Sequence, residues 1–80
     1  MTPTFEQLWA STADLLHRVK KYDRHMAFSR EISEISEAHR MLGVMKKMAG
    51  AEPMADRAVE KLKRMRQRLL TIMEDLLYTA

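Results

Sequence analysis

The chain has 80 residues, with 14 Lys and Arg against 11 Asp and Glu, and no cysteine. This length suits one small domain, which buries only about 60% of the surface of its unfolded chain. The lack of cysteine excludes disulfides, thiolate nucleophiles and Cys-bearing zinc sites. A net charge of +3 is weaker than the field of a dedicated nucleic-acid binder. No apolar run approaches the roughly 20 residues of a membrane span, and Glu6 and Asp14 stand where a signal peptide is basic. We therefore expect a soluble cytoplasmic protein that does not bind membranes.

A first amphipathic helix is predicted over residues 4–26. Thr4 and Gln7 fit a capping box, in which the two side chains satisfy each other's backbone N–H groups. Thr2 as the cap, with Pro3 at the first helical position, is the alternative. The apolar series that defines the helix comprises Phe5, Leu8, Leu15, Val19, Tyr22 and Met26, widened by Trp9 and Leu16.

A second helix is predicted over residues 30–49. Its apolar series is centred about 140° around the helix axis from the first one. This change of phase predicts a turn within residues 23–29, with Ser29 as the next N-cap. A single long helix is the alternative, because no Gly or Pro marks the break. Gly50 predicts the end of this helix. The series comprises Phe28, Ile32, Ile35, Ala38, Leu42, Met45 and Ala49.

Gly43 lies inside the second helix. There a glycine costs about 1 kcal/mol relative to alanine. A tolerated glycine is the simpler interpretation, and a close helix crossing at this position is the other.

A third helix is predicted over residues 53–78. Pro53 suits a first helical turn, and Asp56 places negative charge near the positive end of the helix dipole. The apolar residues recur in alternating steps of three and four, which is the spacing of one helical seam. They are Ala55, Ala58, Leu62, Met65, Leu69, Ile72 and Leu76.

The fold class that follows is all-α, with one domain over residues 1–80. We expect a three-helix up-down-up bundle, or a helical hairpin with a coiled-coil-like seam, completed by oligomerisation. Helices two and three are apolar over an arc wide enough to need two neighbours each. Methionine also forms surfaces that adapt to a partner, although core filling is the alternative for any single methionine. The predicted partner interface comprises Met41, Val44, Met48, Val59, Leu70, Met73 and Leu77.

A basic stripe is predicted along the third helix. Arg57, Lys61, Arg64 and Arg68 stand at i, i+4, i+7 and i+11, and such a stripe can neutralise phosphates. A solvated outer face, with Glu60 pairing to Arg64, is the alternative. No aromatic residue interleaves the stripe, so base stacking is unsupported.

Catalytic and metal-binding patterns are weak. Asp14 and His17 could begin a metal site, but no second pair has this spacing. The serines have no His or Asp at a recognisable spacing, and no Gly-rich phosphate loop is present. We expect no enzymatic activity, cofactor, metal or small-molecule substrate. The sequence favours a small helical protein–protein interaction module of adaptor, co-chaperone or regulator type. It would bind a second copy or another helical protein through a Leu/Ile/Met face. The alternative is a nucleic-acid- or polyanion-associated protein that uses the basic stripe.

Overall fold

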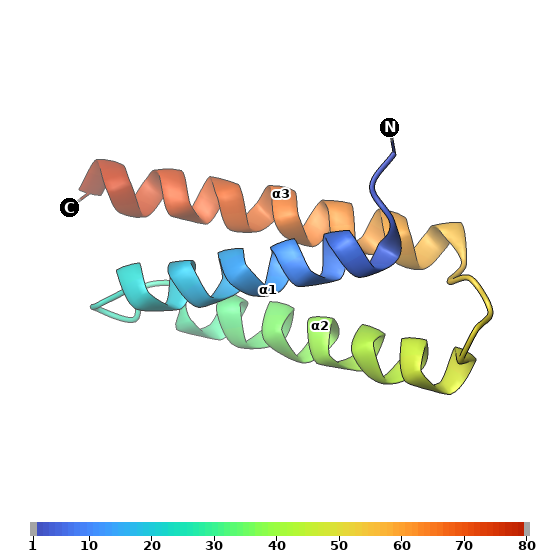
Figure 1. Ribbon diagram of the computed structural model, residues 1–80. Coiled ribbons are helices and arrows are strands. Elements are labelled where there is room, and N and C mark those ends of the chain that lie inside the picture. Colours follow the sequence, from blue (N-terminus) through green and yellow to red (C-terminus); the bar gives the residue numbers. More distant parts are fainter. Residues whose placement is uncertain (1, 80) are drawn as a thin grey trace.

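Three α-helices make up the computed structural model, which describes residues 2–79 (Figure 1). They are α1 (Phe5–Tyr22), α2 (Ser29–Ala49) and α3 (Asp56–Thr79). α1 and α3 run in the same direction, and α2 runs against both. The predicted all-helical, three-helix chain is confirmed. Within residues 2–79, none of the helices combines the length and the apolar character needed to cross a bilayer.

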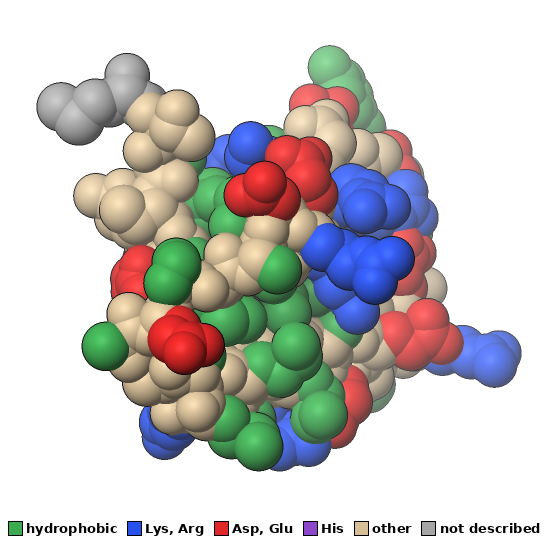
Figure 2. All heavy atoms as spheres, turned by 90° about the vertical axis from the view of Figure 1, so that its right-hand side faces the viewer, with side chains coloured by type: hydrophobic (Ala, Val, Ile, Leu, Met, Phe, Trp, Pro, Cys, Tyr) green, Lys and Arg blue, Asp and Glu red, His purple; other side chains and the backbone are tan. Residues whose placement is uncertain are grey.

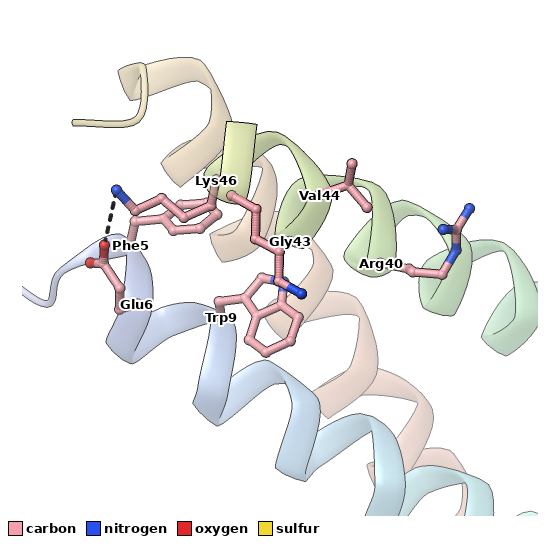
Figure 3. Close-up of a pocket in the computed structure, with 8 residues that line it drawn as sticks. Phe5, Glu6, Trp9, Arg40, Gly43, Val44 and Lys46 are labelled. Atoms are coloured by element: carbon pink, nitrogen blue, oxygen red, sulfur yellow. Dashed lines mark ion pairs between the residues drawn. The ribbon is translucent and has the colours of Figure 1, made fainter. Parts of the chain in front are cut away.

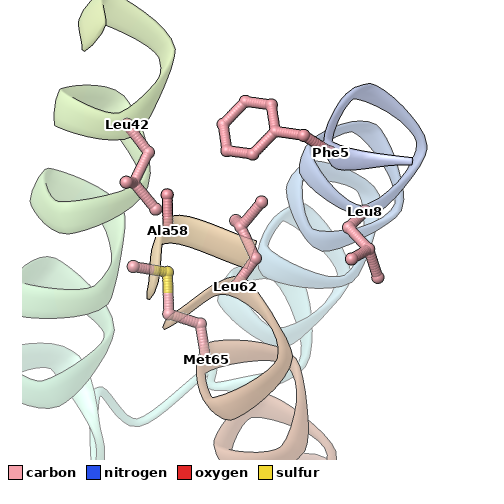
Figure 4. Packing of buried hydrophobic residues seen from close by; sticks show 6 residues of the cluster. All are labelled: Phe5, Leu8, Leu42, Ala58, Leu62 and Met65. Carbon is pink, nitrogen blue, oxygen red and sulfur yellow. The ribbon is translucent and has the colours of Figure 1, made fainter. Parts of the chain in front are cut away.

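The core consists of two hydrophobic clusters strung along α3. Leu62 and Leu69 of α3 are fully buried, one in each cluster. Figure 4 shows the first cluster, in which side chains from all three helices meet. Its members are Phe5, Leu8, Leu42, Ala58, Leu62 and Met65. The second cluster comprises Leu16, Val19, Ile32, Leu69 and Ile72. The predicted seam of α3 is therefore buried from Ala58 to Ile72.

The start of α1 is the predicted capping box. The Gln7 N–H donates to Thr4 Oγ1 at 3.2 Å, and the Thr4 N–H donates to Gln7 Oε1 at 2.9 Å. Thr4, and not Thr2, is therefore the cap. Two otherwise unpaired backbone donors are satisfied in this way.

The turn predicted between the first two helices is confirmed, but two of its details are wrong. α1 ends at Tyr22, four residues before the predicted end at Met26. Ser29 is the first residue of α2 and not its cap; Phe28 holds the cap position without a side-chain hydrogen bond. Tyr22, the last residue of α1, and Met26, which falls in the turn, are both exposed rather than part of the α1 core.

Asp23 organises this turn. Its carboxylate accepts hydrogen bonds from the backbone N–H groups of Ala27 at 2.9 Å and Phe28 at 3.0 Å. The side chain is almost fully buried, and its charge lies near the positive end of the α2 dipole. Met26 adopts φ 56° in the same turn. Asp23 thus caps the end of α1 and binds the backbone that leads into α2.

The start of α3 lies later than predicted. The helix begins at Asp56, and the Ala55 carbonyl accepts the first bonds from Ala58 and Val59. Pro53 belongs to the connection and not to the first turn. The Lys46 ammonium donates to the carbonyl oxygens of Gly50 and Glu52 and so fixes the connection just before Pro53. Ala55, predicted in the seam, is consequently exposed.

Candidate interaction surfaces

The outer face of α2 carries a row of exposed apolar side chains. Met41 is 46% exposed, Val44 39%, Met45 50% and Met48 83%. Their spacing of i, i+3, i+4 and i+7 puts them on one helical face, which we call the α2 ridge. Figure 2 views the end of the bundle with the α2–α3 connection, where hydrophobic side chains gather in the middle and lower part of the face.

Met45 departs from its predicted place in the core. Its half-exposed side chain follows from the way the helices pack. α1 lies against the side of α2 that carries His39 and Gly43. With α2 rotated about its axis in this way, Met45 faces away from the interior. The ridge is therefore wider than the predicted set of Met41, Val44 and Met48.

A pocket of about 370 Å³ flanks the ridge between α1 and α2. In Figure 3 the Trp9 ring lies beneath Gly43, and Glu6 pairs with Lys46 at one end. The Glu6–Lys46 distance is 3.4 Å. This α1–α2 pocket is mostly apolar, and Val44 belongs to both the pocket and the ridge. The full lining is Phe5, Glu6, Trp9, Arg40, Gly43, Val44, Lys46 and Lys47.

Trp9 and His39 form a reciprocal lock between α1 and α2. The Trp9 indole N–H donates to the His39 carbonyl oxygen at 3.0 Å. His39 Nε2 lies 2.9 Å from the Trp9 carbonyl oxygen. Because a carbonyl only accepts, Nε2 must carry the proton and donate. The two rings stack with their centroids 4.2 Å apart. The sequence analysis missed this pair. The available signal was the spacing of His39 and Gly43, which lie four residues apart on the face of α2 that contacts Trp9.

Gly43 is required by the position of Trp9. A Cβ atom at residue 43 would lie 2.9 Å from Trp9 Cζ2, a distance at which something must move. The close-approach interpretation therefore holds, although a side chain and not a helix backbone makes the approach. A side chain here would push against the Trp9 ring, which lines the α1–α2 pocket.

The α3 members of the predicted interface lie apart from the ridge. Val59 and Met73 are partly buried, each against one of the core clusters. Leu70 is also partly buried. Leu77 is 60% exposed and lies near the α1–α2 turn with Tyr22. The structure thus brings Met41, Val44 and Met48 together but does not join the α3 residues to them.

The basic stripe of α3 divides into two parts. Arg57, Lys61 and Arg64 line a groove between α2 and α3. Arg68 instead pairs with Glu31 of α2, and its Nη2 donates to Glu31 Oε1 at 2.7 Å. This hydrogen bond lowers the pKa of Glu31 below its ordinary value of 4.5. Three of the four predicted polyanion-binding residues therefore share one site.

Other charged groups form exposed ion pairs. Glu60 pairs with Lys63 at 3.4 Å and not, as predicted, with Arg64. Glu37 pairs with Arg40 at 2.6 Å, and this hydrogen bond lowers the pKa of Glu37. In the described part of the chain, no group of three or more His, Asp and Glu side chains is arranged to hold a metal ion.

Comparisons with known proteins give no indication of function. No family model matches the sequence, and no curated protein or solved structure matches the chain. The function is therefore inferred from the exposed ridge, the pocket and the groove.

Proposed function

We propose that the protein is a small helical protein–protein interaction module, of adaptor, co-chaperone or regulator type, that binds a helix along the α2 ridge. The observation that supports this function is the row of exposed side chains formed by Met41, Val44, Met45 and Met48. Contiguous exposed apolar patches mark interaction sites. Methionine side chains are flexible and polarizable, so they adapt to the shape of a partner.

The α1–α2 pocket would supply the anchor point of this interface. An amphipathic helix binds by laying its apolar face on a hydrophobic surface and inserting a few large side chains. The pocket lies directly beside Val44, with Trp9 at its floor. One large apolar side chain of the bound helix would enter it. Arg40 and Lys47 line the pocket as well.

The partner that fits the ridge most directly is a second copy of this chain. A two-fold axis between Val44 and Met45 would set two antiparallel α2 helices face to face. Met41 of one copy would then lie against Met48 of the other. Such an interface uses the same patch on both subunits, which is the commonest arrangement in homodimers. Each buried methionine or valine would stabilise the dimer by roughly 1.5–3 kcal/mol before the costs of association.

Sedimentation equilibrium at micromolar concentrations tests the proposal. The wild-type chain should sediment as a dimer or larger species. Met48→Glu and Val44→Glu should be monomeric with unchanged helix content, because both side chains are exposed. Ser33→Glu is the matched control, since it adds the same charge at an exposed position of the same helix. It should associate like the wild type.

Two results would contradict the proposal in different ways. A wild-type chain that stays monomeric at every concentration would exclude the second copy as partner. An oligomer that tolerates both Met48→Glu and Val44→Glu would exclude the α2 ridge as its interface.

A further inference from the structure

The groove between α2 and α3 has an apolar floor and a basic rim. Ile35 and Ala38 of α2 and Met65 of α3 form the floor, in a space of about 520 Å³. Arg57, Lys61 and Arg64 line the α3 side, and Glu34 lies at the α2 side. We call this site the α2–α3 groove. It is separate from the α2 ridge and from the α1–α2 pocket.

The groove stays open because α3 packs mainly against α1 and much less against α2. The Arg68–Glu31 ion pair ties the two helices together beyond one end of it. Ala38 is too small to fill the space between them. Within residues 2–79, no acidic side chain forms an ion pair with Arg57, Lys61 or Arg64. The apolar floor and these cations therefore lie side by side in the open groove.

We propose that the α2–α3 groove binds an acidic amphipathic helix of another protein. Arg57, Lys61 and Arg64 stand at i, i+4 and i+7, and they extend over about 10 Å along α3. A second helix lying in the groove can present carboxylates at the same spacing, so that each meets one cation. Its apolar side chains would cover the floor. Complementary charge of this kind sets orientation and speeds encounter.

The floor favours a protein helix over a nucleic acid. A nucleic-acid strand would satisfy the cations with phosphates, but its bases stack best on aromatic side chains. Ile35, Ala38 and Met65 offer none. An apolar stripe on a helix removes the same side chains from water, which is favourable in proportion to the area covered. Of these two occupants, the acidic amphipathic helix matches both the floor and the rim of the groove.

A synthetic peptide probe tests the groove. We would use a fluorescein-labelled helical peptide of about 18 residues, with a leucine stripe flanked by Glu at i, i+4 and i+7. A second peptide would carry Lys in place of each Glu on the same stripe. Fluorescence anisotropy should show binding of the Glu peptide and no binding of the Lys peptide. Methyl NMR signals of Ile35 and Met65 should shift during the titration.

Lys61→Glu should weaken binding of the Glu peptide by about tenfold or more at low salt. The matched control is Lys63→Glu, which makes the same charge change two residues away, outside the groove. It should bind like the wild type. Met48→Glu should also bind normally, because it damages the α2 ridge and not the groove; this keeps the test separate from the proposed dimer.

Three outcomes would overturn the inference. Equal binding of the Lys peptide would show that charge does not select the partner. Equal losses in Lys61→Glu and Lys63→Glu would show that net charge, and not the groove, is responsible. Binding of a labelled DNA duplex that depends on Lys61, without binding of the Glu peptide, would make the groove a polyanion site.

Discussion

Trp9 contacts α2 through three separate features of its side chain. Its ring stacks on His39, its indole N–H bonds the opposite backbone, and its edge rests on Gly43. These contacts place a large aromatic ring at the floor of the α1–α2 pocket. The pocket therefore depends on residues of two helices that are 30 or more positions apart in the chain.

Gly43→Ala should lower the free energy of unfolding, although alanine is the better helix former. Helix propensity alone would add about 1 kcal/mol of stability. Overpacking against the Trp9 ring costs about 1–3 kcal/mol, so the net change should be a loss. In a Trp9→Ala background the obstacle is absent, and the same substitution should be stabilising. Urea unfolding of the four proteins in this double-mutant cycle measures both effects. A stabilising Gly43→Ala in both backgrounds would show that Trp9 does not restrict residue 43.

Thr12→Val should stabilise the protein. Thr12 is fully buried, and its Oγ1 has no hydrogen-bond partner among the described residues. Valine has the same shape without the hydroxyl, so the desolvation cost of an unpaired polar group, about 1–3 kcal/mol, is removed. Thr71→Val is the control, because Thr71 Oγ1 donates to the Gln67 carbonyl. It should give no comparable gain in thermal unfolding. A destabilised Thr12→Val would mean that the hydroxyl is satisfied.

The predictability of single residues depended on how far apart their partners stand. The capping box joins Thr4 to Gln7 within one turn, so its residue types and spacing were enough. The Trp9–His39 lock depends on the register between α1 and α2. No local pattern specifies that register, and the sequence therefore did not reveal the pair.

At the scale of the helices, the Arg68–Glu31 ion pair ties α2 to α3 near the second core cluster. Glu31→Gln should weaken this tie at neutral pH. The hydrogen bond from Arg68 lowers the pKa of Glu31 in the folded state, so the carboxylate contributes stability above its unfolded pKa. That contribution is lost as the pH falls through the folded pKa, which lies below 4.5.

The wild-type and Glu31→Gln proteins should consequently differ in unfolding free energy at pH 7 and converge in strong acid. Urea titrations at pH 7, 5 and 3 measure the difference. Glu34→Gln is the control on the same helix, since its ion pair with Arg30 is long at 3.7 Å and highly exposed. A Glu31→Gln difference that persists unchanged in acid would show that the charge of Glu31 is not its source.

Helix interiors were more predictable than helix ends. The α3 seam was found because burial on one side imposes a regular spacing over many turns. The end of α1 was misplaced because the helix stops at the Asp23 cap, and the turn that follows passes through Met26 at φ 56° without the glycine or asparagine that usually marks this conformation. The start of α3 was misplaced because Lys46, a residue of another helix, fixes the preceding connection. Both errors arise from tertiary contacts and strained backbone that periodicity does not report.

In the molecule as a whole, α2 is the least buried helix for its length. It contributes three buried residues in 21 positions, against five in the 18 positions of α1. We therefore expect α2 to open at lower free energy than α1 and the centre of α3. Amide hydrogen exchange, measured at dilute concentration so that the ridge is uncovered, should show α2 exchanging first. Equal protection of all three helices would contradict this order.

The candidate sites were predictable in composition but not in arrangement. Helical spacing set Met41 and Met48 of α2 apart from the core series and aligned the cations of α3, but it assigned Met45 to the core. Which of these residues share the ridge, the pocket or the groove depends on how closely each pair of helices packs. The core side chains determine this packing, in which α3 lies mainly against α1.

The pairing of α1 with α3 also affects how the chain folds as it is made. Both core clusters need side chains of α3, the last of them Ile72. A chain that leaves the ribosome N-terminus first therefore shows the apolar sides of α1 and α2 to the cell until α3 has emerged. During that interval the unfinished hairpin is open to aggregation and to chaperones. The first cluster has its full set of side chains once Met65 has emerged, and the second only after Ile72, so neither is complete before α3 leaves the ribosome.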